Sequence, residues 1–254
     1  MIRVAAVGDL HVGQDCVDCV DLAGAGEDAD VLLLAGDLTR VGDPAEAALL
    51  AEELSAVRIP VVAVLGNHDH HSDKVAELRG TLAGAGATVL EGDSTVLDLQ
   101  GATVGIAGTK GFGGGFPGAC GSEFGEPEMK DFMAHSRMLA ERLQAELSSL
   151  DTDIRVALLH YAPIEGTLEG ERREIYPFLG SYLLGEAIDC AGADLALHGH
   201  AHRGTEKGAT PAGVPVRNVA RPVIQRRYNV YMLDKRDRDR AARPVPEALE
   251  TVAL

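Results

Sequence analysis

Five short segments of the chain place Asp, Asn or His directly after an apolar, strand-like run. They are Asp9-Leu10-His11, Gly36-Asp37, Gly66-Asn67-His68-Asp69, His160 and Gly199-His200-Ala201-His202. Carboxylate, amide and imidazole groups without thiolates favour Mn, Fe, Zn or Co as bound metals. A carboxylate can bridge two such ions about 3.5–4 Å apart, and such a pair suits phosphoryl transfer. The five segments therefore predict a site for two metal ions.

Short apolar runs must position these polar residues. The runs are Val4–Val7, Val31–Ala35, Val61–Leu65, Thr103–Ala107, Arg155–Leu159 and Asp194–Leu197. They do not alternate between polar and apolar residues, which is typical of strands covered on both faces. In open α/β sheets, ligands bind beyond the carboxyl ends of the strands. If the strands are parallel, the polar residues converge on one edge, and the glycines before four of them allow sharp turns.

Helical patterns lie between several of the runs. One begins with Asp43 as N-cap, Pro44 as first residue and Glu46 as third, a typical start signal. Its apolar positions form one stripe, Ala47, Leu50, Leu54 and Val57, and Pro60 prevents it from continuing. A longer helix is predicted from about Glu126 to Leu150, with His135 on its surface or in helix packing rather than on a metal.

Alternating strands and helices indicate an α/β fold. Two further strands are predicted at Val214–Val219 and Asn229–Leu233. No linker-like change of composition divides the chain, so we expect one domain over residues 1–234 and a charged C-terminal tail over residues 235–254.

Composition narrows the possible functions. The 254 residues are 46% hydrophobic, enough for a large core, but no apolar run approaches the ~18–20 residues of a membrane span. A strand begins almost at the first residue, so no signal peptide is visible, and we expect a cytoplasmic protein without membrane partners. The net charge of −16 makes long nucleic acid an unfavourable partner. The oligomeric state stays open.

The four cysteines give little guidance. Cys16 and Cys19 have the spacing of a thiol pair or of half a zinc site, but Cys120 and Cys190 stand alone. Because a structural zinc site needs four ligands, we interpret all four as structural or surface thiols.

In their order and spacing, the five segments resemble the calcineurin-like metallophosphoesterase superfamily. The matching motifs are D-x-H, G-D, G-N-H-[DE], a lone His and G-H-x-H, from Asp9 to His202. The resemblance implies a four-layer α/β/β/α sandwich with two divalent or mixed-valence metal ions. It also implies that a metal-bridging hydroxide attacks phosphorus. By position, the first metal would be bound by Asp9, His11 and His202, the second by Asn67, His160 and His200, with Asp37 bridging both.

The resemblance places His68 beside the leaving group as general acid or charge stabiliser. Histidine side chains titrate near neutral pH and can give a proton to an alkoxide. Many family members carry an Asp three residues after the bridging Asp, where it pairs with this histidine, but here that position is Arg40. Orientation of His68 must therefore come from elsewhere, such as Asp43, its neighbour Asp69 or the backbone.

Three other features lie near the motifs. His70 and His71 could reach a substrate or be ordinary loop residues, and His198 is expected to point into strand packing. The segment Gly111-Phe112-Gly113-Gly114-Gly115-Phe116 lacks the Lys and Ser/Thr of a phosphate-binding P-loop. We interpret it as either a flexible lid that places its phenylalanines on a substrate or a mobile surface loop.

The leading functional hypothesis is a metal-dependent phosphoesterase that acts on a small phosphorylated substrate. By resemblance, Gly-Asn-His-Asp rather than Gly-Asn-His-Glu favours phosphodiesterases, including cyclic-nucleotide phosphodiesterases. A phosphomonoesterase or a nuclease stays possible, although the chain has no basic stripe for long nucleic acid. A protein phosphatase is disfavoured by Arg40, and a non-catalytic metal-binding scaffold by the intact ligand positions.

Overall fold

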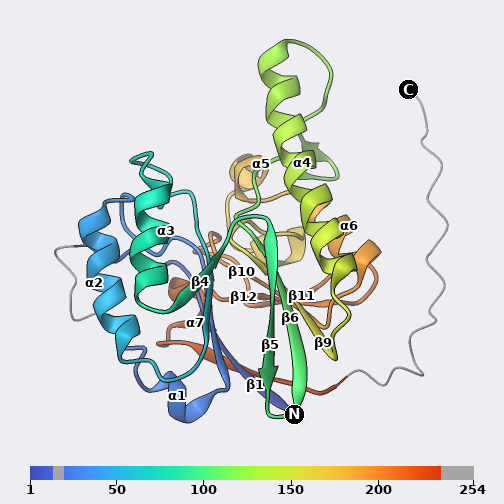
Figure 1. Ribbon diagram of the computed structural model, residues 1–254. Helices are drawn as coiled ribbons and strands as arrows, with labels where there is room; N and C mark the ends of the chain where they lie inside the picture. The colour runs from blue at the N-terminus through green and yellow to red at the C-terminus, as the bar shows by residue number, and fades with distance from the viewer. Residues whose placement is uncertain (14–19, 236–254) are drawn as a thin grey trace.

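Two large β-sheets pack face to face and are covered by helices on both outer sides (Figure 1). The computed structural model describes residues 1–13 and 20–235. Cys16 and Cys19, and all of the predicted tail except Lys235, lie outside the described residues. The mixed α/β architecture with helices flanking two sheets is the predicted fold class.

The first sheet has the strand order β13-β1-β2-β3-β4. Its strands are β1 (Ile2–Val7), β2 (Val31–Ala35), β3 (Val61–Val64), β4 (Ala87–Leu90) and β13 (Asn229–Leu233). The strands from β1 to β4 are parallel, and only β13 runs antiparallel, beside β1. The carboxyl ends of β1, β2 and β3 therefore lie at the same edge, as the sequence predicted.

The second sheet has the order β11-β12-β10-β9-β6-β5. Its strands are β5 (Asp93–Leu99), β6 (Ala102–Thr109), β9 (Ile154–Leu159), β10 (Leu195–His198), β11 (Lys207–Ala209) and β12 (Pro215–Asn218). The inner strands β6, β9, β10 and β12 are parallel, with antiparallel strands at both edges. A separate hairpin is formed by β7 (Gly115–Phe116) and β8 (Ala119–Cys120).

Three apolar cores separate the four layers. The central core lies between the sheets and includes Leu33 of β2 and Val156 of β9. Leu32 and Leu34, on the other face of β2, pack with Leu50 in a second core under the helices of the first sheet. A third core, with Leu143, lies under the helices of the second sheet. Because β2 buries both faces, its sequence has no polar alternation.

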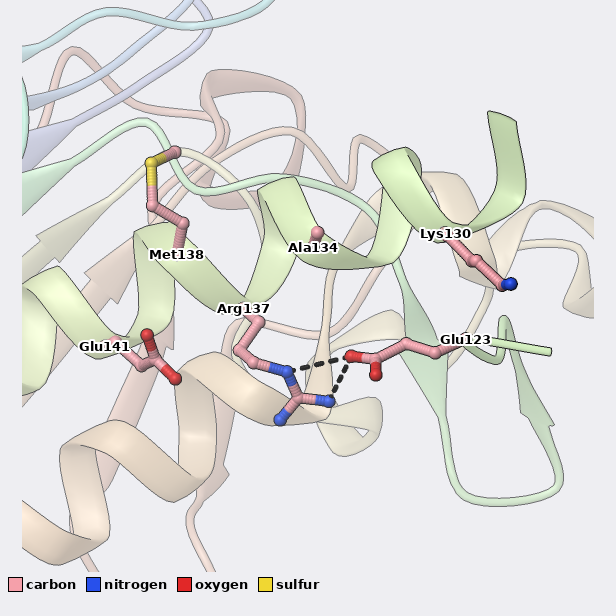
Figure 2. A pocket seen from close by; sticks show the side chains of 6 residues that line it. All are labelled: Glu123, Lys130, Ala134, Arg137, Met138 and Glu141. Carbon is pink, nitrogen blue, oxygen red and sulfur yellow. Dashed lines mark hydrogen bonds and ion pairs between the residues drawn. The ribbon is translucent and has the colours of Figure 1, made fainter. Parts of the chain in front are cut away.

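The helices divide between the two outer layers (Figure 1). Beside the first sheet lie α1 (Ala25–Asp28), α2 (Pro44–Ser55), α3 (Val75–Gly84) and α7 (Arg221–Ile224). Beside the second lie α4 (Pro127–Ser149), α5 (Tyr176–Leu179), α6 (Tyr182–Ala191) and the short 3-10 turns η2 (Glu165–Leu168) and η3 (Arg173–Ile175). The N-terminal half of α4 projects beyond the body of the fold, where Arg137 pairs with Glu123 at 2.6 Å (Figure 2).

Both predicted helices are present. Asp43 caps α2 by accepting a hydrogen bond from Ala45 N at 2.8 Å. Glu46 does not close a capping box on Asp43; its carboxylate instead accepts from Val41 N at 2.9 Å. The helix ends at Ser55, so Val57 follows it rather than completing its stripe. His135 is exposed on α4, as predicted.

The glycine-rich segment is packed into the fold rather than lying as a loop on the surface. Phe116 is 2% exposed and belongs to a small core of its own. Phe112 packs on Phe132 with 5.1 Å between ring centroids. A Cβ on Gly113 would lie 2.4 Å from Pro177 O, so glycine permits close backbone packing here. Phe116 is buried and Phe112 is half-buried, so the surface-loop interpretation was wrong, while the lid interpretation stays a prediction.

Among the described residues, no helix is both long enough and apolar enough to cross a membrane.

Candidate metal centre

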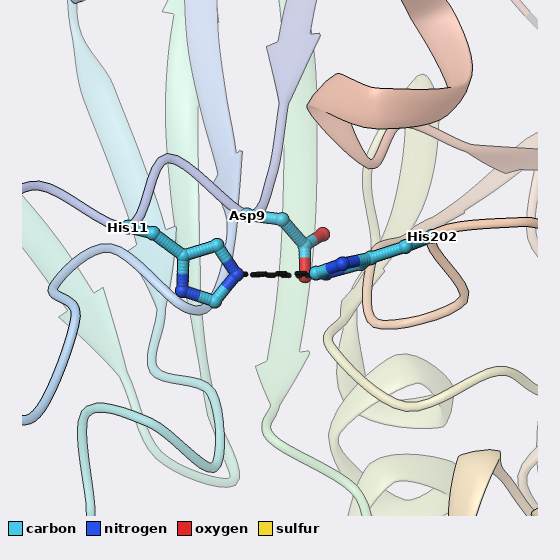
Figure 3. Close-up of side chains that lie close together, drawn as sticks. All are labelled: Asp9, His11 and His202. Atoms are coloured by element: carbon cyan, nitrogen blue, oxygen red, sulfur yellow. Dashed lines mark hydrogen bonds and ion pairs between the residues drawn. The ribbon is translucent and has the colours of Figure 1, made fainter.

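Asp9, His11 and His202 form the first potential ligand group. One ligand atom from each lies within 4.8 Å of the others. His202 Nε2 is 2.8 Å from Asp9 Oδ1, and His11 Nε2 is 3.5 Å from His202 Nε2. Figure 3 shows the Asp9 carboxylate between the two imidazole rings. Asp9 follows β1, whereas His202 lies beyond β10, so both sheets contribute to this group.

Asp37, His160 and His200 form the second group, again within 4.8 Å. His160 Nε2 lies 3.3 Å from Asp37 Oδ1 and 3.0 Å from Asn67 Oδ1, which adds the amide oxygen that the sequence predicted. Asp37 also lies 3.8 Å from His11 Nε2 through its other oxygen. Asp37 therefore faces both groups, the position that a bridging carboxylate requires.

Backbone carbonyls fix the imidazoles of the second group. His160 donates from Nδ1 to Ala35 O at 2.9 Å, which leaves Nε2 free to face Asp37. His200 donates from Nε2 to Phe178 O at 3.1 Å, which leaves Nδ1 free. Metal-binding histidines typically make such a hydrogen bond with the second ring nitrogen, because it selects the tautomer and orients the ring.

Burial and mutual charge shift the pKa values of this cluster. Burial lowers the pKa of His160, but the charge and hydrogen bond of Asp37 more than reverse this effect and raise the pKa to about 9. Burial alone would raise the pKa of Asp37, but His160 brings it well below its usual range. Burial and the charge of His160 lower the pKa of His200 to about 3. In the chain alone, a protonated imidazole therefore balances the buried carboxylate. The donor set fits divalent cations of the borderline type.

The backbone of the site is held in an unusual conformation. Asp9, Asp37 and His200 all have left-handed φ values, 58°, 49° and 69°. Such residues cost about 1–3 kcal/mol each and concentrate at functional sites. The glycine before Asn67 allows close approach rather than a special φ: a Cβ on Gly66 would lie 2.1 Å from Asp37 Oδ1. The expected role of glycine as a turn residue holds for Gly36, with φ 80°.

His68 lies at the rim of the centre and is oriented by the backbone. Its Nδ1 donates to Arg40 O at 2.7 Å, so the residue that replaces the expected Asp holds His68 through its carbonyl. Nε2 then faces the centre, 3.9 Å from Asp37 Oδ2. The Asp43 side chain caps α2 instead. Of the alternatives that the sequence left open, the backbone is the one found.

Asp69 has a structural role. Its carboxylate is fully buried and accepts four hydrogen bonds: from Leu38 N (3.1 Å), Thr39 N (2.8 Å), Thr39 Oγ1 (2.6 Å) and Gly66 N (2.8 Å). These donors come from the segments after β2 and β3. Asp69 therefore ties together the two segments that carry Asp37 and Asn67.

Replacing Asp69 with asparagine should destabilise the fold by about 3 kcal/mol, because the amide NH₂ would face two donors whichever way it turned. Denaturant unfolding measures the change. Asp73→Asn is the matched control, since Asp73 is exposed in the same loop. Equal stability of the two variants would show that Asp69 does not tie the segments together.

The remaining histidines are His198, His71 and His70, and only His70 has a contact that the sequence did not suggest. His198 is fully buried and bonds to Thr167 Oγ1 at 2.8 Å, in strand packing. His71 is an exposed loop residue. His70 is half-buried, and its Nε2 lies 3.6 Å from Glu91 Oε2. Sequence analysis missed Glu91, although it directly follows β4.

A family model described as calcineurin-like phosphoesterase matches residues 2–204. The chain belongs to this family. A search of curated protein sequences finds no match. The sequence resemblance therefore identified the family correctly, and the ligand groups lie inside the matched region.

Several solved structures share the fold. Phosphopantetheinyl hydrolase from Mycobacterium tuberculosis has a TM-score of 0.65 at 16% identity, covering 91% of this chain and 96% of its own. A putative 5′-nucleotidase from Staphylococcus aureus has a TM-score of 0.55 at 19% identity, covering 85% and 48%. The Thermus thermophilus protein TT1561 has a TM-score of 0.52 at 18% identity, covering 85% and 88%. At these identities the likeness extends to the fold alone.

Proposed function

We propose that the protein is a binuclear-metal-dependent phosphoesterase that hydrolyses a small phosphorylated substrate. The observation that carries this proposal is the position of Asp37 between two ligand groups, 3.3 Å from His160 Nε2 and 3.8 Å from His11 Nε2. A single metal site would not need a carboxylate that faces both groups. Membership of the calcineurin-like phosphoesterase family supports hydrolase chemistry.

Each proposed residue has one task. The proposed ligands are Asp9, His11 and His202 for one ion, Asn67, His160 and His200 for the other, and Asp37 for both. Two bound divalent ions would supply an activated water and stabilise charge on the phosphoryl oxygens. His68 would present Nε2 to the leaving-group oxygen, because Arg40 O fixes its other ring nitrogen. The exposure of His68 and His202 leaves this side of the centre open to a substrate.

The preferred substrate class is a phosphodiester, such as a cyclic nucleotide. This preference rests on Gly-Asn-His-Asp at residues 66–69, which resembles the phosphodiesterase branches of the family. The net charge of −16 makes long nucleic acid an unfavourable substrate. A phosphomonoesterase of the same family is the main alternative.

Metal analysis and a substrate panel test the proposal together. We expect purified protein to bind about two ions of Mn, Fe, Zn or Co per chain, and activity to disappear on chelation and return with metal. The panel contains an aryl monoester, an aryl diester, and 2′,3′- and 3′,5′-cyclic nucleotides. A phosphopantetheinyl ester is included because a protein of similar fold is named as a hydrolase of that group.

The outcomes separate the alternatives. Faster turnover of diesters than of monoesters supports the phosphodiesterase assignment, whereas the reverse supports a phosphomonoesterase. Absence of turnover with every substrate and every ion would contradict the enzymatic proposal and favour a non-catalytic scaffold.

A further inference from the structure

Lys110 lies at the same edge as the proposed ligands but is not one of them. It directly follows β6, which pairs with β9 in the second sheet, and the end of β9 leads into His160. The Lys110 carbonyl accepts hydrogen bonds from His160 N at 3.2 Å and Tyr161 N at 3.0 Å. The rule that places ligands beyond the carboxyl ends of parallel strands therefore also places a lysine there.

Two aromatic rings hold the ammonium group of Lys110. Its Nζ lies 5.0 Å from the ring centroid of Phe112 and 5.3 Å from that of Tyr161. Phe112 in turn packs on Phe132 and on His135, at 5.1 and 4.8 Å between centroids. A cation over aromatic faces is attracted by the ring quadrupole. The ammonium is thus positioned before any ligand arrives, which lowers the entropic cost of binding.

This ammonium lacks a close partner in the described part of the chain. An ammonium has three hydrogen-bond donors, but Nζ of Lys110 makes no hydrogen bond and no ion pair within 4.0 Å there. The carboxylates of Glu91 and Asp37 act on it only from greater distance. Lys110 Nζ is not among the fully buried atoms without a partner in the described part of the chain, so it reaches solvent and its three donors are open to an anionic ligand.

The opposite sheet adds further polar atoms without partners. Glu91 follows β4, which pairs with β3 beside the segment of Asn67. Glu91 Oε1 and His70 Nε2 are both buried and have no hydrogen-bond partner, and the two side chains lie 3.6 Å apart. Each sheet therefore presents a polar group without a hydrogen-bond partner after one of its parallel strands, and Glu91 is close enough to act on the charge of Lys110.

Lys110 reaches the proposed ligands through an aromatic neighbour rather than by a direct contact. The Tyr161 ring packs against the His200 ring, with 4.4 Å between centroids, and Lys110 packs on that same Tyr161 ring. One aromatic side chain thus connects the ammonium to His200, one of the proposed ligands. A small substrate with an anionic group beside its phosphoryl ester can therefore contact both the centre and Lys110.

We propose that Lys110 binds a second anionic group, a carboxylate or a phosphate, of the substrate whose phosphoryl ester lies at the metal centre. This inference rests on the proposed function and adds a specificity-determining residue to it. The chain carries a net charge of −16, so a fixed cation beside the centre selects substrates by where they carry additional negative charge. The competing role for Lys110 is to balance the charge of Glu91 without touching substrate.

Non-hydrolysable phosphonates test this inference by calorimetry on the metal-loaded protein. Propylphosphonate and 3-phosphonopropionate have similar shapes but differ by one carboxylate, and 1,3-propanediphosphonate carries a second phosphonate instead. We expect at least one of the two doubly anionic ligands to bind about tenfold more tightly than propylphosphonate, the effect of one charge-assisted hydrogen bond. Which of them gains affinity distinguishes a carboxylate from a phosphate.

Three variants test whether the gain in affinity from the second anionic group comes from the Lys110 ammonium. Lys110→Met should reduce the preference to within about twofold, while Lys110→Arg should keep most of it. Lys130→Met makes the same charge change on the exposed face of α4 and should leave the preference intact (Figure 2). Metal content and thermal unfolding of Lys110→Met should match the unmodified protein, which separates lost binding from lost folding.

Two results would overturn the inference. If Lys110→Met weakens all three phosphonates equally, or if the unmodified protein does not prefer a second anion, Lys110 does not bind one. In both cases propylphosphonate still binds, and the proposed phosphoesterase function stands. If propylphosphonate itself does not bind to metal-loaded protein, the proposed function fails and the Lys110 subsite fails with it.

Discussion

Asp37→Asn should reduce phosphoesterase activity by on the order of 10³-fold and lower the metal content below two ions per chain. Asp37 is 1% exposed and faces both ligand groups. Asparagine keeps the shape and can still accept from His68 N, which bonds to Asp37 Oδ1 at 2.8 Å. The variant therefore removes the negative charge while it keeps the local geometry. Metal analysis and turnover of the best panel substrate measure both effects.

Asp43→Asn is the matched control for this change. Asp43 caps α2, and asparagine caps helices as well as aspartate does, so activity, metal content and stability should stay unchanged. An Asp37→Asn protein with two bound ions and full activity would show that Asp37 does not bridge. If the variant keeps one ion and some activity, the main contribution of Asp37 is to bind the second ion.

The clustering of the potential ligands was predictable from the positions of their residues after the strands. Each of Asp9, Asp37, Asn67, His160 and His200 follows an apolar strand, and parallel strands must end at one edge. The sequence also implied that both faces of β2 are buried, because polar and apolar residues do not alternate along it. The strand-end rule did not specify that these side chains come from two sheets rather than one. That information came only from the family resemblance.

The unpredicted features depend on contacts between distant segments. Asp69 looks like part of the chemical motif, but its carboxylate is bonded to the segment after β2. The orientation of His68 depends on the backbone carbonyl of Arg40. Every residue type has such a carbonyl, so the identity of residue 40 did not indicate this contact. Glycines at 113–115 suggested mobility, yet they allow backbone to pack closely against residues 177–180.

Lys110 and Glu91 follow strands like the potential ligands but belong to no metal-ligand motif. Both obey the strand-end rule, after β6 and β4. Neither belongs to a recognised metal-ligand pattern, so the search for ligand types passed over them. Lys110 lies shortly after the predicted run Thr103–Ala107 and could have been noticed, whereas Glu91 could not, because β4 was not among the predicted strands. The rule concerns position, and it applies to substrate contacts as well as to metal ligands.

His68→Ala should slow hydrolysis unequally, depending on the leaving group. With an alkyl ester, whose alkoxide needs a proton, we expect a loss of roughly 10²–10⁴-fold, the usual contribution of general acid catalysis. With a p-nitrophenyl ester, whose leaving group departs without a proton, the loss should be about tenfold or less. The physical basis is that Arg40 O holds Nδ1 and leaves Nε2 to face the centre.

The leaving-group dependence of kcat/KM, measured over a series of esters, separates the two roles considered for His68. General acid catalysis predicts a steeper dependence in His68→Ala than in the unmodified protein. Charge stabilisation alone predicts parallel lines, and that result would exclude proton donation by His68.

His71→Ala is the matched control, because His71 is exposed in the same loop and should leave both slope and rate unchanged. Unchanged metal content in both variants would confirm that His68 acts on the substrate rather than as a ligand, even though its ring shares a possible cation site with His11 and Asp37.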